Sequence, residues 1–348
     1  MKNKVYLFFF IVLALMGQNI FAAGSKAIDA KKYNVALSVV WEGNTYAVQS
    51  REEFYAEADR QRAAGKIGNV YYLNADGSAE KQVSDLEDLY TRKVDILIIQ
   101  PVNPPAVSDI IKKFYQRGTI VIPCVSPLAT DSYTLSMVSD DMAFGRTGAE
   151  FLVKKLEGKG NIIALDGIDG LSVAINRWKG AMEVFNKYPN IKILGKVYAD
   201  WDYAKGKAAT ENLLAAFPKI DGVWSSGGDM TRGAIEAFLE AGRPLVPMMG
   251  EDANGFLKAW KRVAGKDKFA AVGCSMPTYF FADALKIGVD ILEGKSAVGK
   301  DLKKDNILQV YQITDANLDK YVREDLADSF WANTKMDEAT LQKVYGNK

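Results

Sequence analysis

The chain has 348 residues, of which 48% are hydrophobic and 25% are charged. These proportions are typical of a soluble globular protein that is long enough for two packed lobes. The formal net charge of +1 provides no basic excess to attract nucleic acid, and the absence of histidine excludes Ser-His-Asp catalysis, Cys-His catalysis and histidine-based metal sites.

The N-terminal residues have the pattern of a signal peptide. Lys2 and Lys4 precede an apolar run, Val5–Met16, which has the length of a signal-peptide core and is short for a membrane span. We expect cleavage after Ala22, so that residues 1–22 are removed and the mature protein is exported to the periplasm. An uncleaved membrane anchor is the alternative that the sequence leaves open.

Beyond this segment, short apolar runs alternate with longer segments in which apolar residues recur every three or four positions. Apolar runs of this kind are typical of parallel sheets covered by helices on both faces. About four βα units precede Ser139 and about four follow it, which predicts an α/β protein with two doubly wound parallel-sheet lobes. The predicted strands are Val35–Trp41, Val70–Asn74, Asp95–Gln100, Ile120–Cys124, Asn161–Asp166, Ile193–Tyr198, Gly222–Ser225, Val246–Gly250 and Ala270–Cys274. The predicted helices include Val48–Ala64, Glu80–Thr91, Val107–Gln116, Phe144–Leu156, Val173–Tyr188, Ala204–Phe217, Thr231–Glu240 and Phe280–Leu292.

Ligands of doubly wound sheets bind beyond the carboxyl ends of the strands. We therefore expect the functional site to be built from the segments that follow the strands, which are rich in Gly, Asp, Asn and Pro, with aromatic residues among them. These segments are Glu42–Tyr46, Pro101–Pro105, Val125–Leu128, Gly167–Leu171, Trp201–Tyr203, Ser226–Asp229, Glu251–Asn254 and Ser275–Pro277.

Two motifs that suggest enzyme or metal chemistry are incomplete. Glu293–Lys300 contains Gly-Lys-Ser, but Val289 stands where a phosphate-binding loop needs its first glycine, and the motif follows a helix. Asp166–Gly170 (DGIDG) matches neither an EF-hand loop nor a dinucleotide fingerprint. We therefore expect no catalytic residue, no metal site and no cofactor.

The segment Tyr198–Gly206 (YADWDYAKG) places a tryptophan between two carboxylates. Asp200 and Asp202 offer too few oxygen ligands for a metal ion, and the chain supplies no histidine or nucleophile to accompany them. We expect Asp202 to cap the following helix and Asp200 to brace the turn. Trp201 is then the functional candidate, as a flat surface for one face of a ligand.

The two cysteines, Cys124 and Cys274, both lie at the ends of apolar runs. In an oxidising compartment a disulfide between them is possible. Two buried free thiols are the other interpretation, since free cysteine behaves as a small hydrophobic residue.

Seven landmarks follow the order found in one protein family. Together, from about Asn34 to Tyr311, they make the sequence resemble periplasmic sugar-binding proteins of the ribose-binding type, which feed ABC importers. A single landmark is weak support, whereas the ordered set is specific. The landmarks are Asn44–Ala58 (NTYAVQSREEFYAEA), Val94–Val107 (VDILIIQPVNPPAV), Val138–Leu152 (VSDDMAFGRTGAEFL), Asp166–Phe185 (DGIDGLSVAINRWKGAMEVF), Ala199–Gly206 (ADWDYAKG), Gly227–Phe238 (GGDMTRGAIEAF) and Gly250–Asp252 (GED).

The resemblance implies two lobes joined by a three-segment hinge near Ser139, Ser275 and Asn306. A ligand would lie in the cleft between the lobes and close them by hinge motion. The lobes implied are an N-terminal lobe of residues 23–139 and 276–306, and a C-terminal lobe of residues 140–275 and 307–348.

The resemblance also implies ligand contacts at five positions. Asn44 matches the amide of the first loop, Tyr46 a stacking aromatic residue, and Trp201 the aromatic residue of the second lobe. Arg177 matches an arginine of the cleft whose guanidinium can hold two adjacent oxygens, and an exposed helix arginine is the alternative. Asp252 matches a ligand aspartate, and a carboxylate that caps a helix is the alternative.

Departures from the ribose-binding pattern indicate a different ligand. Val125 and Ser126 replace an Asp-Arg pair, and Ser275 replaces a glutamine. Gly227 replaces an asparagine, with Asp229 as a possible substitute two residues on. Because a site that pairs each hydroxyl rejects poorly matched ligands, the changed polar set implies a changed ligand, larger than ribose or less polar on one side.

Two further candidates end the first strand beside the expected cleft. Trp41 and Glu42 could add ligand contacts, while a tryptophan packed at a strand end is the alternative for Trp41. In the C-terminal tail, Ile313–Lys348, we expect Phe330 and Trp331 to hold the tail against a lobe, and a last helix over Asp337–Tyr345.

The function that the resemblance implies is that of a periplasmic solute-binding protein. It would bind a carbohydrate or polyol without chemical turnover and deliver it to an ABC permease in the inner membrane, and we expect a monomer. The alternative is a receptor that presents its bound ligand to a chemotaxis or signalling sensor. We expect Trp201→Ala and Arg177→Ala each to weaken binding without unfolding the protein.

Overall fold

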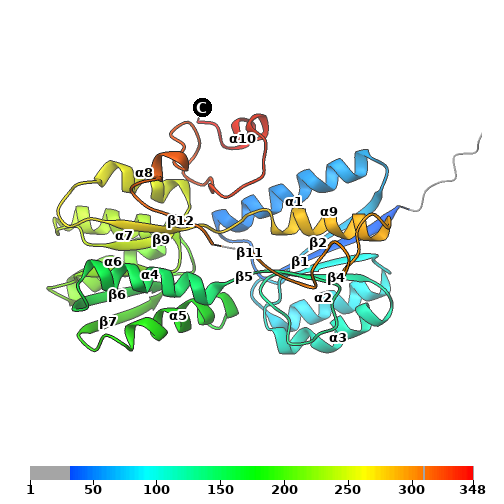
Figure 1. Cartoon of the computed structure of the whole chain (residues 1–348), viewed down its shortest axis with the longest axis horizontal. Coiled ribbons are helices and arrows are strands. Elements are labelled where there is room, and N and C mark those ends of the chain that lie inside the picture. Colours follow the sequence, from blue (N-terminus) through cyan, green and yellow to red (C-terminus); the bar gives the residue numbers. More distant parts are fainter. Residues whose placement is uncertain (1–31, 309, 348) are drawn as a thin grey trace, which may run out of the picture. The chain divides into compact units, whose positions relative to one another are not determined.

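Two six-stranded sheets organise residues 32–308 and 310–347, the part of the chain that the computed structural model describes (Figure 1). The signal peptide predicted for residues 1–22, with its cleavage site, lies outside the described residues. Within the described ranges, no helix has the length and apolar character that a membrane crossing requires.

The first sheet is entirely parallel and is covered on both faces. Its strands are β1 (Tyr33–Val39), β2 (Ile67–Asn74), β3 (Ile96–Ile99), β4 (Ile120–Val125), β5 (Ser136–Ser139) and β11 (Asp305–Leu308). They lie in the order β2-β1-β3-β4-β5-β11. One face packs on α1 (Thr45–Ala63) and α9 (Phe280–Leu292), and the other on α2 (Ala79–Thr91) and α3 (Pro104–Gln116) (Figure 1). Val35 and Leu37 join the first of these cores and Ala36 the second, as strand alternation requires.

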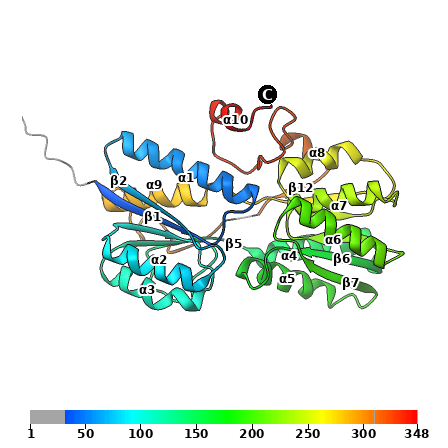
Figure 2. The ribbon, with the colours of Figure 1, turned by 180° about the vertical axis from the view of Figure 1, so that it is seen from behind.

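The second sheet repeats this plan with one antiparallel edge. Its strands are β6 (Gly160–Asp166), β7 (Ile191–Tyr198), β8 (Gly222–Ser225), β9 (Met248–Glu251), β10 (Ala271–Cys274) and β12 (Gln312–Ile313). They lie in the order β7-β6-β8-β9-β10-β12, with β12 antiparallel to β10. One face packs on α6 (Tyr203–Ala216), α7 (Gly228–Glu240) and α8 (Asn254–Val263), and the other on α4 (Asp141–Lys155) and α5 (Ser172–Phe185) (Figures 1 and 2).

The chain passes from one sheet to the other three times. It leaves the first sheet after β5, returns after β10, and leaves again between β11 and β12. The segment after β12, which ends in α10 (Glu338–Tyr345), runs beside α1 and α8 in both ribbon views (Figures 1 and 2). These observations confirm the predicted α/β class, with two doubly wound lobes and three connecting segments.

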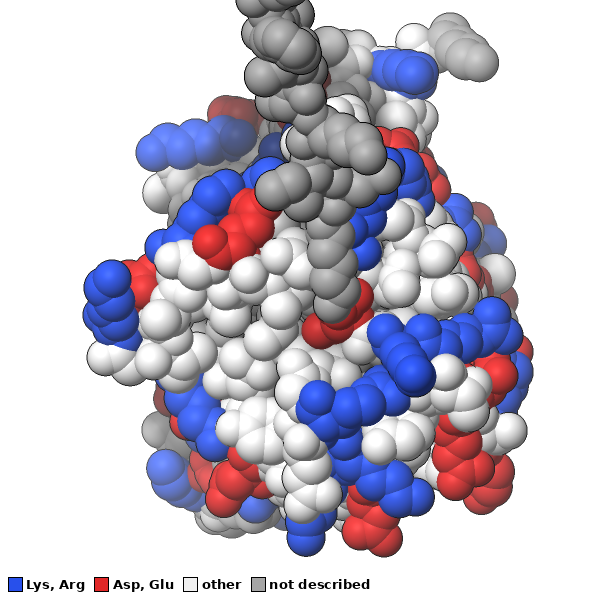
Figure 3. Space-filling view, turned by 90° about the vertical axis from the view of Figure 1, so that its right-hand side faces the viewer, with Lys and Arg blue, Asp and Glu red and all other residues white. Residues whose placement is uncertain are grey.

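Several short elements are absent from the predicted set. β5, β11 and β12 have only two to four residues each and, unlike the equally short β3, are not continuous buried apolar runs. The two cysteines are free and buried, with Cys124 in β4 and Cys274 in β10, so the interpretation as buried thiols is confirmed. On the face shown in Figure 3, basic side chains have acidic neighbours, in keeping with the nearly balanced charge of the chain.

Candidate ligand-binding site

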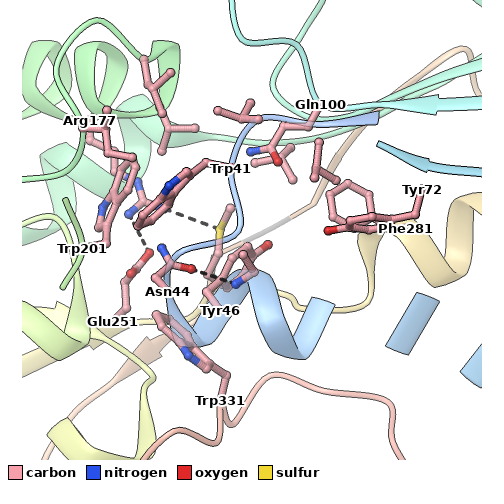
Figure 4. Close-up of a pocket in the computed structure, with 18 residues that line it drawn as sticks. Trp41, Asn44, Tyr46, Tyr72, Gln100, Arg177, Trp201, Glu251, Phe281 and Trp331 are labelled. Atoms are coloured by element: carbon pink, nitrogen blue, oxygen red, sulfur yellow. Dashed lines mark hydrogen bonds and ion pairs between the residues drawn. The ribbon is translucent and has the colours of Figure 1, made fainter. Parts of the chain in front are cut away.

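A cavity is lined by residues that follow strands of both sheets (Figure 4). Its empty space is about 710 Å³, a volume that includes open solvent at its mouth. Apolar and aromatic side chains form most of its lining. The polar side chains among the lining residues are Asn44, Gln100, Arg177 and Glu251.

Five of the predicted site residues line this cavity: Trp41, Asn44, Tyr46, Arg177 and Trp201. The first three come from the end of β1 and the start of α1, and the other two from the second lobe. The structure therefore brings together residues that are far apart in the sequence, although their contact with a ligand remains a prediction.

Glycines make room for two of the three tryptophans that line the cavity. A Cβ atom added at Gly43 would lie 1.8 Å from the Trp41 ring, and one added at Gly167 would lie 2.1 Å from the Trp201 ring. A Cβ at Gly227 would lie 2.6 Å from Trp201 Cδ1. Gly227, which replaces the asparagine of ribose binders, therefore leaves the space that the Trp201 ring needs.

A tight turn carries Trp201 from β7 to α6. Asp200 and Trp201 both have φ of 53°, a left-handed conformation that non-glycine residues adopt rarely. Asp202 accepts a hydrogen bond of 2.8 Å from the backbone N–H of Lys205, and Asp200 pairs with the Lys205 ammonium at 2.5 Å. The predicted roles of these aspartates, as helix cap and turn brace, are thus confirmed. Trp201 Nε1 donates to the carbonyl of Ser226 at 3.0 Å, which fixes the ring at the cavity.

Arg177 is a buried member of a charged cluster, so the alternative of an exposed helix arginine is wrong. Its side chain is 2% exposed. Its guanidinium pairs with Asp141 at 3.2 Å and with Glu251 at 2.6 Å, and it lies over the Phe144 ring at 3.8 Å. Nη1 also donates to the Ser226 carbonyl at 2.6 Å, whereas among the described residues Nη2 has a single weak acceptor, the Met276 sulfur at 3.7 Å. Nη2 is therefore the guanidinium nitrogen best placed to donate to a ligand.

Buried carboxylates outnumber the buried arginine in this cluster. Burial raises the pKa of Glu251 to about 7, and the attraction of Arg177 only partly offsets this effect. Burial likewise raises the pKa of Asp252 to about 7 and that of Asp141 to about 6. Burial therefore favours the protonated forms of these three carboxyl groups, of which Glu251 lines the cavity.

Asn44 and Tyr46 are anchored to the protein at one end. Asn44 Oδ1 caps α1 by accepting a hydrogen bond of 2.8 Å from the backbone N–H of Ala47, which leaves its Nδ2 group to donate to a ligand. The Tyr46 hydroxyl donates to the Pro277 carbonyl at 2.8 Å, so that its ring, rather than its hydroxyl, is the part available to a ligand.

The other five predicted residues lie outside the cavity lining and have protein partners. Glu42 forms an ion pair with Arg51, and Ser126 accepts a hydrogen bond of 3.1 Å from Ser172. Asp229 accepts one of 2.7 Å from Thr45. Glu42 and Asp229 line a second, more open hollow, which shares Asn44 and Trp201 with the cavity.

Asp252 and Ser275 hold the connecting segments. Asp252 accepts hydrogen bonds from the backbone N–H groups of Met276, at 2.9 Å, and Asn333, at 2.8 Å. Ser275 Oγ accepts one of 3.1 Å from the backbone N–H of Tyr311. Any role of these two buried side chains in ligand binding remains a prediction.

Sequence reasoning missed several lining residues. Glu251 ends β9 one position before Asp252, and it lay within a segment expected at the site without being singled out. Val125, which in the sequence marks only a departure from the ribose-binding pattern, lines the cavity with φ of 66°, an unusual conformation for a β-branched residue. Trp331 comes from the tail, and no local sequence signal relates it to the cavity.

The fold and the site together define a two-lobed α/β binding protein whose ligand cavity receives residues from both sheets. The family model described as the periplasmic binding protein domain matches residues 35–296. The chain therefore belongs to this family, which confirms the membership that the ordered landmarks indicate.

Named relatives agree with this assignment. The chain is 28% identical over 299 residues to the xylitol-binding protein of Mycolicibacterium smegmatis, covering 84% of this chain and 83% of that protein. It is 29% identical over 276 residues to the ribose import binding protein RbsB of Bacillus subtilis, covering 79% and 86%. Among solved structures, an ABC transporter solute binding protein from Thermobispora bispora shares the fold. That match has a TM-score of 0.78 at 24% identity and covers 90% of this chain and 94% of the other.

Proposed function

We propose that this chain is the solute-binding component of an ABC importer and that it binds a small sugar or polyol in the cavity between its two sheets. The observation that carries the proposal is the lining itself. Aromatic rings from both lobes, including Trp41, Tyr46 and Trp201, surround a few polar groups at Asn44, Arg177 and Glu251. Aromatic faces suit the C–H surfaces of sugars, and the polar groups suit their hydroxyls.

The relatives support the ligand class and the transport role. The names of the two curated relatives described above refer to xylitol binding and ribose import, and both are binding proteins rather than enzymes. Delivery to a membrane permease, location in the periplasm and a monomeric state are parts of this proposal. The names favour delivery over presentation of the ligand to a sensor.

A thermal-shift screen tests the proposal. The purified protein is unfolded and refolded to remove any copurified ligand, and is then melted with D-ribose, xylitol, D-allose, myo-inositol, L-arabinose or glycerol. A ligand at about 100 times its Kd adds about 2.7 kcal/mol to the free energy of unfolding, which gives a clear rise in Tm. A Trp201→Ala variant serves as the control with a damaged cavity. The absence of any rise across the panel would overturn the proposal.

A second experiment separates transport from sensing. Deletion of the gene should abolish uptake of the radiolabelled sugar or polyol that binds in the screen. Uptake that continues unchanged, together with a lost chemotactic response to the same compound, would instead favour the sensor role.

A further inference from the structure

The C-terminal tail reaches the cavity through Trp331. This side chain is 3% exposed and lines the cavity beside Tyr46, with the two ring centroids 5.3 Å apart and their planes at 78° (Figure 4). Its Nε1 donates a hydrogen bond of 2.8 Å to Thr45 Oγ1. The ring is therefore held in place at the cavity by two neighbouring residues of α1.

One stripe of α1 is built to receive the tail. Thr45, Gln49 and Glu53 follow one another at four-residue spacing, so they lie on one side of the helix. Gln49 is fully buried and holds the backbone of Trp331 at two points, accepting from its N–H at 2.9 Å and donating to its carbonyl at 3.0 Å. Glu53 accepts a hydrogen bond of 2.6 Å from the Thr334 hydroxyl. The tail covers this stripe and helps to explain why Gln49 and Glu53 are buried.

The second lobe holds the same segment through the start of α8. The backbone N–H groups of Asn254 and Gly255 donate to the carbonyls of Phe330, at 2.7 Å, and Asp328, at 2.9 Å. These tail carbonyls satisfy donors that the first turn of a helix leaves unpaired, and α8 has no side-chain cap of its own. The tail is thus attached to both lobes on either side of Trp331.

We infer that the tail forms a third wall of the ligand site and that Trp331 is a ligand-contacting residue that helps to set specificity. This inference rests on the proposed function. A ligand would then meet aromatic surface from three parts of the chain: the first lobe at Tyr46, the second lobe at Trp201 and the tail at Trp331. Gln49 is a positioning residue, since it acts through the backbone of Trp331.

Substitution of Trp331 tests the inference. The dissociation constants of D-ribose, xylitol, D-allose and myo-inositol are measured by calorimetry for the wild type, Trp331→Ala and Trp331→Phe. For each compound that the wild type binds, we expect Trp331→Ala to raise Kd roughly tenfold or more and Trp331→Phe to raise it roughly threefold. The ratio of Kd values between compounds should also change, because a contact with the ligand depends on ligand shape.

Trp260→Phe is the matched control. Trp260 is a buried tryptophan of α8 whose Nε1 donates to Asp315 at 2.9 Å, and it is not among the residues that line the cavity. This control should lower Tm and leave every Kd unchanged. If Trp331→Ala does not fold, Trp331→Phe decides the question.

The outcomes distinguish a failure of this inference from a failure of the proposed function. If the wild type binds a compound and the folded Trp331 variants bind it within twofold of the wild type, with unchanged ratios, the inference is overturned and the proposed function stands. If the wild type binds none of the four compounds or the other panel members, the proposed function fails and the inference fails with it.

Discussion

Thr45 and Asp229 lie on different lobes and are joined directly by a hydrogen bond of 2.7 Å from Thr45 Oγ1 to Asp229 Oδ2. The same Thr45 oxygen accepts a hydrogen bond of 2.8 Å from Trp331 Nε1. One hydroxyl therefore links the first lobe, the second lobe and the tail. Burial raises the pKa of Asp229, and the bond from Thr45 partly offsets this effect.

Thr45→Val should weaken ligand binding by favouring separation of the lobes. Valine removes both hydrogen bonds and leaves the buried Asp229 carboxylate without its partner, so Kd should rise roughly threefold to tenfold. Small-angle X-ray scattering of the ligand-free variant should give a larger radius of gyration. Thr210→Val is the control because it makes the same change of residue type. The Thr210 hydroxyl donates to the Gly206 carbonyl at 2.8 Å, so this hydrogen bond lies within α6 and joins no lobes. An unchanged Kd and radius of gyration would contradict this prediction.

Gly167→Ala should displace Trp201 and weaken binding while the fold persists. The added Cβ would lie 2.1 Å from the Trp201 ring, so the ring must leave its position. We expect Kd to rise roughly tenfold or more, with an unchanged far-ultraviolet circular dichroism spectrum. Gly68→Ala is the control, since its nearest neighbour would lie 3.4 Å from the new Cβ. Equal affinity in both variants would mean that Trp201 does not contact the ligand.

Arg177→Ala should destabilise the protein as well as weaken binding, which revises the expectation drawn from the sequence. The substitution leaves Asp141 and Glu251 buried without their cation, a loss that typically costs about 3–5 kcal/mol. Urea denaturation measures the free energy of unfolding. Arg146→Ala removes an ion pair with Glu183 that is about one-third exposed, and it should cost less than about 1 kcal/mol. Equal effects of the two substitutions would show that the buried cluster adds little stability.

Stability should fall as the pH rises from about 4.5 to 7, and Glu251→Gln should reduce that fall. The pKa of Glu251 is raised from its usual 4.5 to about 7, so within this window the folded chain retains a proton that the unfolded chain has lost. The free energy of unfolding then decreases by up to about 1.4 kcal/mol per pH unit for this group. Asp252 acts with the same sign.

Urea denaturation at pH 5, 6, 7 and 8 checks this prediction. Glu183→Gln, at a side chain that is 43% exposed, is the matched control and should leave the slope unchanged. A slope that Glu251→Gln does not alter, or a wild type that gains stability over this range, would contradict the assigned shift.

The two-lobed fold could be predicted because its main strands and helices carry strong periodicity and its landmarks occur in a specific order. Trp41, Asn44, Tyr46 and Trp201 could be placed at the site because each follows a strand or begins a helix. Arg177 lies inside α5, and only the family resemblance indicated its place at the site.

The rest of the site depends on features that the sequence does not express locally. The sequence predicts Asp252 as a ligand contact, whereas the neighbouring Glu251 lines the cavity and Asp252 does not. Neighbouring positions at a strand end point in different directions, and the sequence does not show which of them faces the cavity. Trp331 meets Gln49 across 282 residues of sequence, and no periodic pattern encodes a contact of that range.

The late position of β11 in the chain has a consequence for biogenesis. This strand completes the edge of the first sheet beside β5, yet all of β6 to β10 are synthesised between the two. A nascent chain therefore cannot finish its N-terminal lobe until Leu308 has emerged from the ribosome, and pairings across such long loops form slowly. The first sheet thus stays one strand short until most of the chain has been synthesised.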